Sequence, residues 1–236
     1  MVSLQSKKTV VAGGTSGIGL ATALLFKKAG ATVTVTGRNA TKLSNAKKEG
    51  LQVAEVDSSN IPALEAFFNA QGNFDNLVIA LGSTKGIGNF KDLSLDDVRA
   101  GFEEKYWAQL YTLKAALPYI NAGGCITLIT GNAASRQFPQ TSGIGSINGA
   151  LEIYVPILAK ELQPLRINAV SPGIIDTPWW NFLPEDAKNK AFEEYATHIA
   201  VGRVGHPGDI AHTILFLSEN DYMTGKIITC DGGSIS

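Results

Sequence analysis

The sequence predicts an α/β fold, a doubly wound seven-stranded parallel sheet with helices on both of its faces. Apolar runs of strand length alternate with stretches of helical periodicity along the chain. Several runs are apolar at nearly every position, as is typical of parallel strands covered on both faces. A glycine-rich turn joins the first strand to the first helix. With 236 residues, 44% of them hydrophobic, the chain suits a single domain over residues 1–236.

The strands are placed by short apolar runs between turn signals, and the helices by longer periodic stretches. Expected strands cover residues 9–13, 31–36, 52–56, 76–80, 125–130, 166–170 and 226–230. Expected helices cover residues 17–29, 41–49, 61–71, 95–120, 143–162 and 208–218. Ser94 and Asp97 predict a capping box at the start of the fourth helix, and Pro118 predicts its end. Residues 178–198 are less regular and predict an insertion near a binding crevice.

Composition excludes several classes of partner. The formal net charge is -1 and no block of Lys and Arg is present, so we expect no nucleic-acid partner. No apolar run approaches the ~18 residues of a membrane span, and the N-terminal segment lacks the apolar core of a signal peptide. Cys125 and Cys230 have neither metal-ligand nor redox spacing, which predicts free thiols and no metal. We expect a cytoplasmic protein with no membrane contact.

The turn after the first strand has the composition of a phosphate site. Gly13 permits a sharp exit from the strand, Gly17 lets the backbone approach a pyrophosphate, and Gly19 allows close helix packing. The N-terminus of the following helix supplies free N–H groups and a positive partial charge. This context predicts nucleotide binding, whereas a glycine pattern alone would be a weak signal.

The spacing of the turn, Gly-x-x-x-Gly-x-Gly, together with further motifs, resembles the classical short-chain dehydrogenase/reductase family over almost the whole chain. The supporting segments are residues 13–19, Asp57, Asp75-x-Leu77-Val78, Gly82, Leu117-Pro118, residues 166–173, residues 202–211, Thr224-Gly225 and Asp231-Gly232-Gly233. The resemblance implies a Rossmann-like fold and a nicotinamide dinucleotide cofactor.

The resemblance also implies which residues hold the cofactor. Thr15, Ser16 and Ile18 are expected at the pyrophosphate, Asp57 and Ser58 at the adenine, Ala80 and Gly82 at the ribose, and Pro172, Gly173, Ile174 and Thr177 at the nicotinamide.

The end of the second strand favours NADP(H) over NAD(H). An NAD site places a carboxylate there to bind two ribose hydroxyls. Here the strand ends in Gly37-Arg38, with no acid before Glu49. Arg38 offers a planar cationic fork to a 2′-phosphate, although an arginine at this place is also compatible with a solvated surface residue.

The catalytic positions depart from the family. The family has a serine at the end of the fifth strand, a tyrosine thirteen residues later and a lysine four residues after that. Anchoring on Ala150-Leu151 puts Asn148 at the lysine position and Ile144 at the tyrosine position, and thirteen residues before Ile144 lies Gly131. The pair Tyr222 and Lys226 has the required spacing but spans a turn at Thr224-Gly225, so it does not share a helix face.

Lys105 stands where the family has an asparagine in the long helix. From there its ammonium can reach the space near Asn148, where burial would lower its pKa. Asn132 and Asn148 can donate hydrogen bonds to a substrate carbonyl. An equally weighted alternative is that Lys105 only replaces the charge of the missing lysine. Trp179 and Trp180 follow the Pro172-Gly173 loop and are candidate pocket residues.

Two functions therefore stay open. One is an atypical NADP(H)-dependent oxidoreductase that acts on a small carbonyl or alcohol by relocated or substrate-assisted proton transfer. The other is a catalytically silent NADP(H)-binding sensor or partner subunit. The resemblance implies a homodimer or homotetramer in either case, with Tyr106, Trp107, Leu110 and Leu113 contributing apolar area to a helical interface.

Overall fold

The computed structural model describes residues 3–234, which form one parallel sheet of seven strands. The strand order is β3-β2-β1-β4-β5-β6-β7. The strands are β1 Lys8–Ala12, β2 Thr32–Gly37, β3 Gln52–Glu55, β4 Phe74–Ile79, β5 Ile120–Ile129, β6 Arg166–Pro172 and β7 Ile227–Cys230. The order reverses between β1 and β4, so a crevice opens there at the carboxyl ends of the strands, where ligands bind in such sheets. The predicted doubly wound fold is confirmed.

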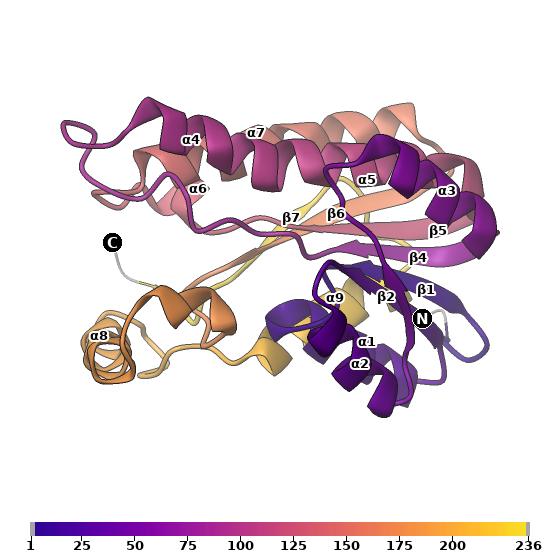
Figure 1. Cartoon of the computed structure of the whole chain (residues 1–236), viewed down its shortest axis with the longest axis horizontal. Helices are drawn as coiled ribbons and strands as arrows, with labels where there is room; N and C mark the ends of the chain where they lie inside the picture. Colours follow the sequence, from indigo (N-terminus) through magenta and orange to yellow (C-terminus); the bar gives the residue numbers. More distant parts are fainter. Residues whose placement is uncertain (1–2, 235–236) are drawn as a thin grey trace.

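Helices cover both faces of the sheet (Figure 1). On one face lie α3, α4, α5 and α7, and on the other lie α1, α2 and α9. The helices are α1 Gly17–Lys28, α2 Ala40–Lys48, α3 Ile61–Gln71, α4 Leu95–Gly101, α5 Ala108–Ala116, α6 Ala133–Arg136, α7 Ser142–Glu161, α8 Glu185–Thr197 and α9 Pro207–Glu219. Because successive strand residues point to opposite faces, Val10 packs in the core under one helix layer and Val11 in the core under the other.

The prediction of one continuous helix over residues 95–120 is wrong, because the helix is interrupted and ends before Ile120. Between α4 and α5 the chain forms a π-helix, Phe102–Trp107. A 3₁₀ turn, Leu117–Tyr119, closes α5 at the predicted proline. Ile120 already belongs to β5, opposite Phe74 of β4.

The capping box predicted at the start of α4 is also wrong. The side chain of Ser94 makes no cap hydrogen bond. The carboxylate of Asp97 instead accepts from the backbone N–H of Gly86 at 2.7 Å and lies 3.3 Å from Nζ of Lys85. The aspartate therefore fixes the loop before α4 rather than the end of the helix.

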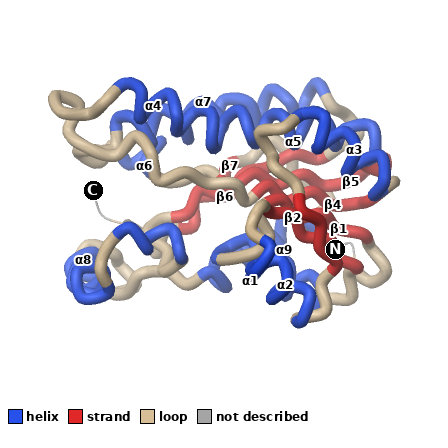
Figure 2. The backbone as a smooth tube through the Cα atoms, in the orientation of Figure 1, coloured by secondary structure: helices blue, strands red, loops and turns tan. Residues whose placement is uncertain are grey.

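The irregular segment predicted over residues 178–198 contains a 3₁₀ turn, Pro178–Phe182, followed by α8. Figure 2 shows α8 beyond the sheet, apart from both helix layers and on the side where the carboxyl ends of the strands lie. The segment is thus placed beside the crevice, as the sequence predicts. Within residues 3–234 no helix is long and apolar enough to cross a membrane.

Candidate active site

A cleft of about 1040 Å³ lies at the carboxyl ends of the strands. Its walls come from the segments that follow β1, β4, β5 and β6 and from α7. Most of the residues predicted to bind the cofactor line it: Gly13, Ser16, Gly17, Ile18, Gly19, Ala80, Gly82, Pro172, Gly173, Ile174 and Thr177. The three candidate catalytic residues, Lys105, Asn132 and Asn148, line it as well.

The glycine turn has the backbone that a dinucleotide needs. Gly13 has φ 75°, and a Cβ there would lie 2.6 Å from the carbonyl oxygen of Ala80. A Cβ on Gly17, with φ 52°, would press on Thr177 at 3.3 Å. Ser16 is the N-cap of α1 but makes no side-chain cap bond, so the first N–H groups of the helix keep their capacity for a phosphate. The turn therefore fits a pyrophosphate.

The predicted adenosine residues form a second group beside the cleft. Gly37 at the end of β2 packs on Thr15, whose Cγ2 would be 2.9 Å from an added Cβ. The pKa of the Asp57 carboxyl lies below its usual value because Ser59 donates its backbone N–H, and Arg38 adds a favourable charge. Thr15, Arg38, Asp57 and Ser58 are not among the residues that line the cleft itself.

Lys42 is a cleft residue that the sequence analysis missed. It lies in the first turn of α2, where its backbone N–H donates to Oδ1 of Asn39, the N-cap residue, at 2.9 Å. The signal was available, because a lysine three residues after a cap asparagine and four after Arg38 lies close to the end of β2. Lys42 gives this side of the cleft a cation, and Arg38, four residues earlier in the chain, lies outside the residues that line it.

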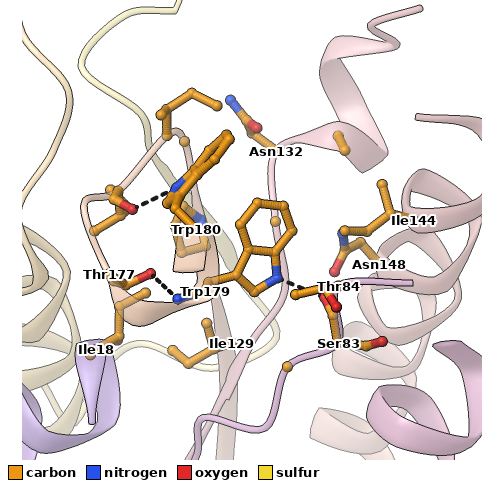
Figure 3. Close-up of a pocket in the computed structure, with 18 of the residues that line it drawn as sticks. Ile18, Ser83, Thr84, Ile129, Asn132, Ile144, Asn148, Thr177, Trp179 and Trp180 are labelled. Carbon is orange, nitrogen blue, oxygen red and sulfur yellow. Dashed lines mark hydrogen bonds between the residues drawn. The ribbon is translucent and has the colours of Figure 1, made fainter. Parts of the chain in front are cut away.

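Gly131, Ile144 and Asn148 meet at one end of the cleft. A Cβ on Gly131 would lie only 2.9 Å from Nδ2 of Asn148. The amide of Asn148 therefore takes the space that a serine side chain at 131 would need. Ile144 presents an apolar side chain, and its backbone N–H donates to the carbonyl of Gly86 at 2.9 Å. Figure 3 shows Ile144 and Asn148 on the same side of the cleft.

Lys105 enters this site from the π-helix between α4 and α5 and is only 6% exposed. Its Nζ donates to Oδ1 of Asn148 at 2.7 Å and to the carbonyl oxygen of Thr130 at 2.8 Å. Burial lowers the pKa of Lys105 to about 8, and the charge of Glu152 offsets part of this effect. The predicted approach of Lys105 to Asn148 is thus present in the structure.

Glu152 is a second residue that the sequence analysis missed. It lies one turn after Asn148 on α7, and its Oε1 accepts from Oγ1 of Thr130 and Oγ of Ser171, both at 2.9 Å. The spacing of four residues from Asn148 was the available signal. Glu152 connects the ends of β5 and β6, and its negative charge acts to raise the pKa of Lys105.

Asn132 and the two tryptophans complete the walls. Nδ2 of Asn132 is buried beside the carboxylate of Asp231. Trp180 is buried and donates from Nε1 to the carbonyl of Ile175 at 3.1 Å. Trp179 reaches across the cleft and donates from Nε1 to the carbonyl of Ser83 at 2.7 Å (Figure 3).

No group of three or more His, Cys, Asp or Glu side chains suited to a metal ion occurs in the described part of the chain. The cleft is therefore built from a glycine turn, the cation of Lys42, the buried Lys105 and amide donors. This arrangement suits a dinucleotide together with a small organic ligand.

Comparison with known proteins decides the family. The family described as enoyl-(acyl carrier protein) reductase matches residues 12–234. The chain is a short-chain dehydrogenase/reductase. It is 31% identical to the 3-oxoacyl-(acyl-carrier-protein) reductase of Thermotoga maritima, over 98% of this chain and 99% of the relative. The corresponding reductase of Chlamydia muridarum is 29% identical, over 98% of each chain.

Solved structures of the family superpose closely. A small-chain dehydrogenase in complex with NADPH is 31% identical, with a TM-score of 0.85 over 97% of this chain and 98% of that one. A short-chain dehydrogenase/reductase from Serratia marcescens is 27% identical, with a TM-score of 0.86 over 98% of each chain. Membership of the family assigns this chain to the oxidoreductases that bind a nicotinamide cofactor and act on small molecules.

Proposed function

We propose that this protein is an NADP(H)-dependent oxidoreductase that acts on a small carbonyl compound or the corresponding alcohol, with Lys105 and Asn148 in place of the usual tyrosine and lysine. The observation that carries the proposal is the 2.7 Å hydrogen bond from Lys105 to Asn148 inside the cofactor cleft. Bound NADPH would supply the hydride, and the residues of the chain would bind, orient and polarise the substrate.

The cofactor is held by the groups described above. The N–H groups at the start of α1 bind the pyrophosphate, and Arg38 with Lys42 binds the 2′-phosphate. The segment from Pro172 to Thr177 borders the nicotinamide side of the cleft. The NADPH complex of the relative with 31% identity supports the choice of NADP(H).

The reacting end is polarised by donors rather than by a tyrosine. Because Oδ1 of Asn148 accepts from Lys105, its Nδ2 is turned toward Gly131, where it can donate to a substrate oxygen. Two bonds leave one N–H of the Lys105 ammonium available. A lysine with a pKa of about 8 is protonated at neutral pH and acidic enough to return a proton to a reduced substrate.

The alternative is an NADP(H)-binding sensor or partner subunit without turnover. Ile144 favours it, since an isoleucine neither gives nor accepts a proton. In that case the hydrogen bonds of Lys105 only hold the π-helix against α7 and the segment that follows β5. NADPH consumption with a panel of carbonyl compounds separates the two functions, because the sensor binds the cofactor and consumes none.

NADPH is expected to bind at least tenfold more tightly than NADH, a difference of about 1.4 kcal/mol. The reason is that Arg38 pairs with the 2′-phosphate and no acid at the end of β2 binds the ribose hydroxyls. Fluorescence titration with both reduced cofactors measures this preference. Arg38→Ala should remove it, and Arg99→Ala, which breaks only an exposed pair with Asp96, should preserve it. Equal affinities in the parent protein would contradict the proposal.

The protein is expected to form a homodimer or homotetramer. Leu113, which the sequence placed at this interface, is instead buried in the core because its side chain packs toward the sheet. Trp107, Ile153 and Ile157 leave large apolar side chains exposed in the layer that contains α5 and α7, which suits a symmetric interface. Multi-angle light scattering at micromolar concentration measures the mass, and Ile153→Glu should shift the protein toward monomer. A monomeric parent at that concentration would count against the interface.

A further inference from the structure

The cleft has several apolar and aromatic side chains among the residues that line it. Ile87, Phe138, Trp179, Phe182 and Leu183 line it together with Ile144. Wide apolar walls of this kind bind the flat faces of uncharged ligands.

The charged side chains at the reacting end of the cleft disfavour a substrate that carries a permanent anionic group. Within residues 3–234 the Lys, Arg, Asp and Glu side chains that line the cleft are Lys42, Glu104 and Lys105. Lys42 belongs to the cofactor side. Glu104 accepts from Oγ of Ser83 at 2.7 Å, and the Lys105 ammonium donates to Thr130 and Asn148. A carboxylate or phosphate on the substrate would lose its hydration, with only the one remaining N–H of the buried Lys105 ammonium to bind it and the carboxylate of Glu104 to repel it.

Trp179 is positioned directly over the reacting end. In the sheet β5 lies between β4 and β6, so the bond from Trp179, which follows β6, to Ser83, which follows β4, crosses the carboxyl end of β5. Edge-to-face contacts with Trp180 and Phe182, at centroid distances of 4.8 and 5.4 Å, hold the indole in place. In Figure 3 the indole of Trp179 lies between Trp180 and the side of the cleft that carries Ile144 and Asn148.

The missing tyrosine restricts the kind of carbonyl that can react here. Hydride addition to a saturated ketone leaves an alkoxide, whose conjugate acid has a pKa far above that of a phenol, so it needs an acid that acts in concert with the hydride transfer. A quinone gives a phenolate, whose conjugate acid has a pKa of about 10. Amide and ammonium donors can stabilise such a delocalised anion without a tyrosine.

Resting on the proposed function, we propose that the substrate is an uncharged planar quinone whose ring packs against the indole of Trp179, with an oxygen directed at Asn148. The quinone takes up a hydride from NADPH, so that one carbonyl oxygen becomes a hydroxyl and the other a phenolate. The phenolate then takes one proton from Lys105, which is replaced from solvent. Quinone, NADPH and one proton thus give hydroquinone and NADP⁺.

The test is isothermal titration calorimetry on the whole protein, with and without saturating NADP⁺, so that the readout is binding rather than turnover. The probes are menadione, the saturated bicyclic ketone 1-decalone and the charged 1,4-naphthoquinone-2-sulfonate. Menadione is expected to bind at least tenfold more tightly than either of the others. Trp179→Ala should weaken the binding of menadione at least tenfold. Trp179→Phe keeps an aromatic face but loses the bond to Ser83, and its affinity for menadione should stay within threefold of the parent. Tyr222→Ala, outside the cleft and 98% exposed, is the control and should leave binding unchanged.

Equal binding of menadione and 1-decalone, absence of menadione binding, or an unaltered affinity in Trp179→Ala overturns the substrate class. The proposed function fails separately. Bound menadione without any consumption of NADPH supports the aromatic site and contradicts an oxidoreductase. Turnover of 1-decalone without quinone binding supports an oxidoreductase and contradicts the quinone.

Discussion

Replacing Lys105 by methionine is expected to lower NADPH-dependent reduction of menadione at least 100-fold, with cofactor affinity changed less than threefold. Methionine fills a similar volume but removes the ammonium that orients Asn148 and polarises its amide. Loss of one positioned donor at a developing oxyanion costs about 10²–10³ in rate, and loss of a general acid about 10²–10⁴. Stopped-flow or steady-state absorbance measures the rate, and Lys48→Met, an exposed lysine on α2, is the matched control for charge.

The pH dependence separates a chemical role of Lys105 from a structural one. The ammonium is the active form and its pKa is about 8, so the reduction rate should fall as the pH rises through that value. Lys105→Met should have a low rate without this fall. A purely structural lysine would give a variant with lower stability and the pH profile of the parent.

The contribution of Lys105 to the free energy of unfolding of the parent protein should rise with pH, whereas the reduction rate should fall. Between about pH 8 and the ordinary lysine pKa of 10.5, the unfolded chain keeps the proton and the folded chain releases it. The unfolded state then binds more protons, so the contribution of Lys105 to the free energy of unfolding rises with pH in this window. Chemical denaturation of the parent and Lys105→Met at several pH values measures this contribution as the difference between the two slopes. If Lys105→Met kept full activity on menadione, Lys105 would have no role in the reaction and would only stabilise the fold.

The sequence predicted the sheet and the cofactor side because both depend on local signals. The glycine turn, the apolar strands and Pro118 each act within a few residues, and every predicted strand is present in the structure, although β5 begins five residues earlier than predicted. The π-helix at Phe102–Trp107 has no comparable pattern, since its extra residue per turn is decided by packing. Ser94 and Asp97 have the spacing of a capping box, but the carboxylate of Asp97 accepts a hydrogen bond from the backbone N–H of Gly86 instead.

The sequence predicted only part of the reacting end of the cleft, for a related reason. Positions counted from family motifs named Lys105, Gly131, Ile144 and Asn148, and all of them line the cleft. Their contacts join segments far apart in the sequence, and counting does not give the direction of a side chain. Glu152 was missed because its partners are Thr130, directly after β5, and Ser171 on β6, which meet it only in the folded chain.

The usual catalytic set can be rebuilt only by exchanging the two polar residues. Asn148→Lys alone would put a second ammonium where Oδ1 of Asn148 now accepts from Lys105 at 2.7 Å. Two buried like charges would repel each other, and unpaired buried charge costs about 3–5 kcal/mol. Ile144→Tyr/Asn148→Lys is therefore expected to unfold at a clearly lower temperature than the parent, as differential scanning calorimetry would measure.

Adding Lys105→Asn to that double variant should restore the melting temperature and create reduction of a saturated ketone such as 1-decalone, at least 100-fold above the parent. The triple variant pairs one lysine with one asparagine, as the parent does, and provides a tyrosine as general acid where Ile144 gives none. Gly131→Ser can follow only after Asn148 is replaced, because its Cβ would otherwise lie 2.9 Å from Nδ2. NADPH consumption, with NADPH affinity measured in parallel as the control, reports the gain. A triple variant that binds NADPH, melts like the parent and still reduces no saturated ketone would show that the missing tyrosine is not what restricts the chemistry of this site.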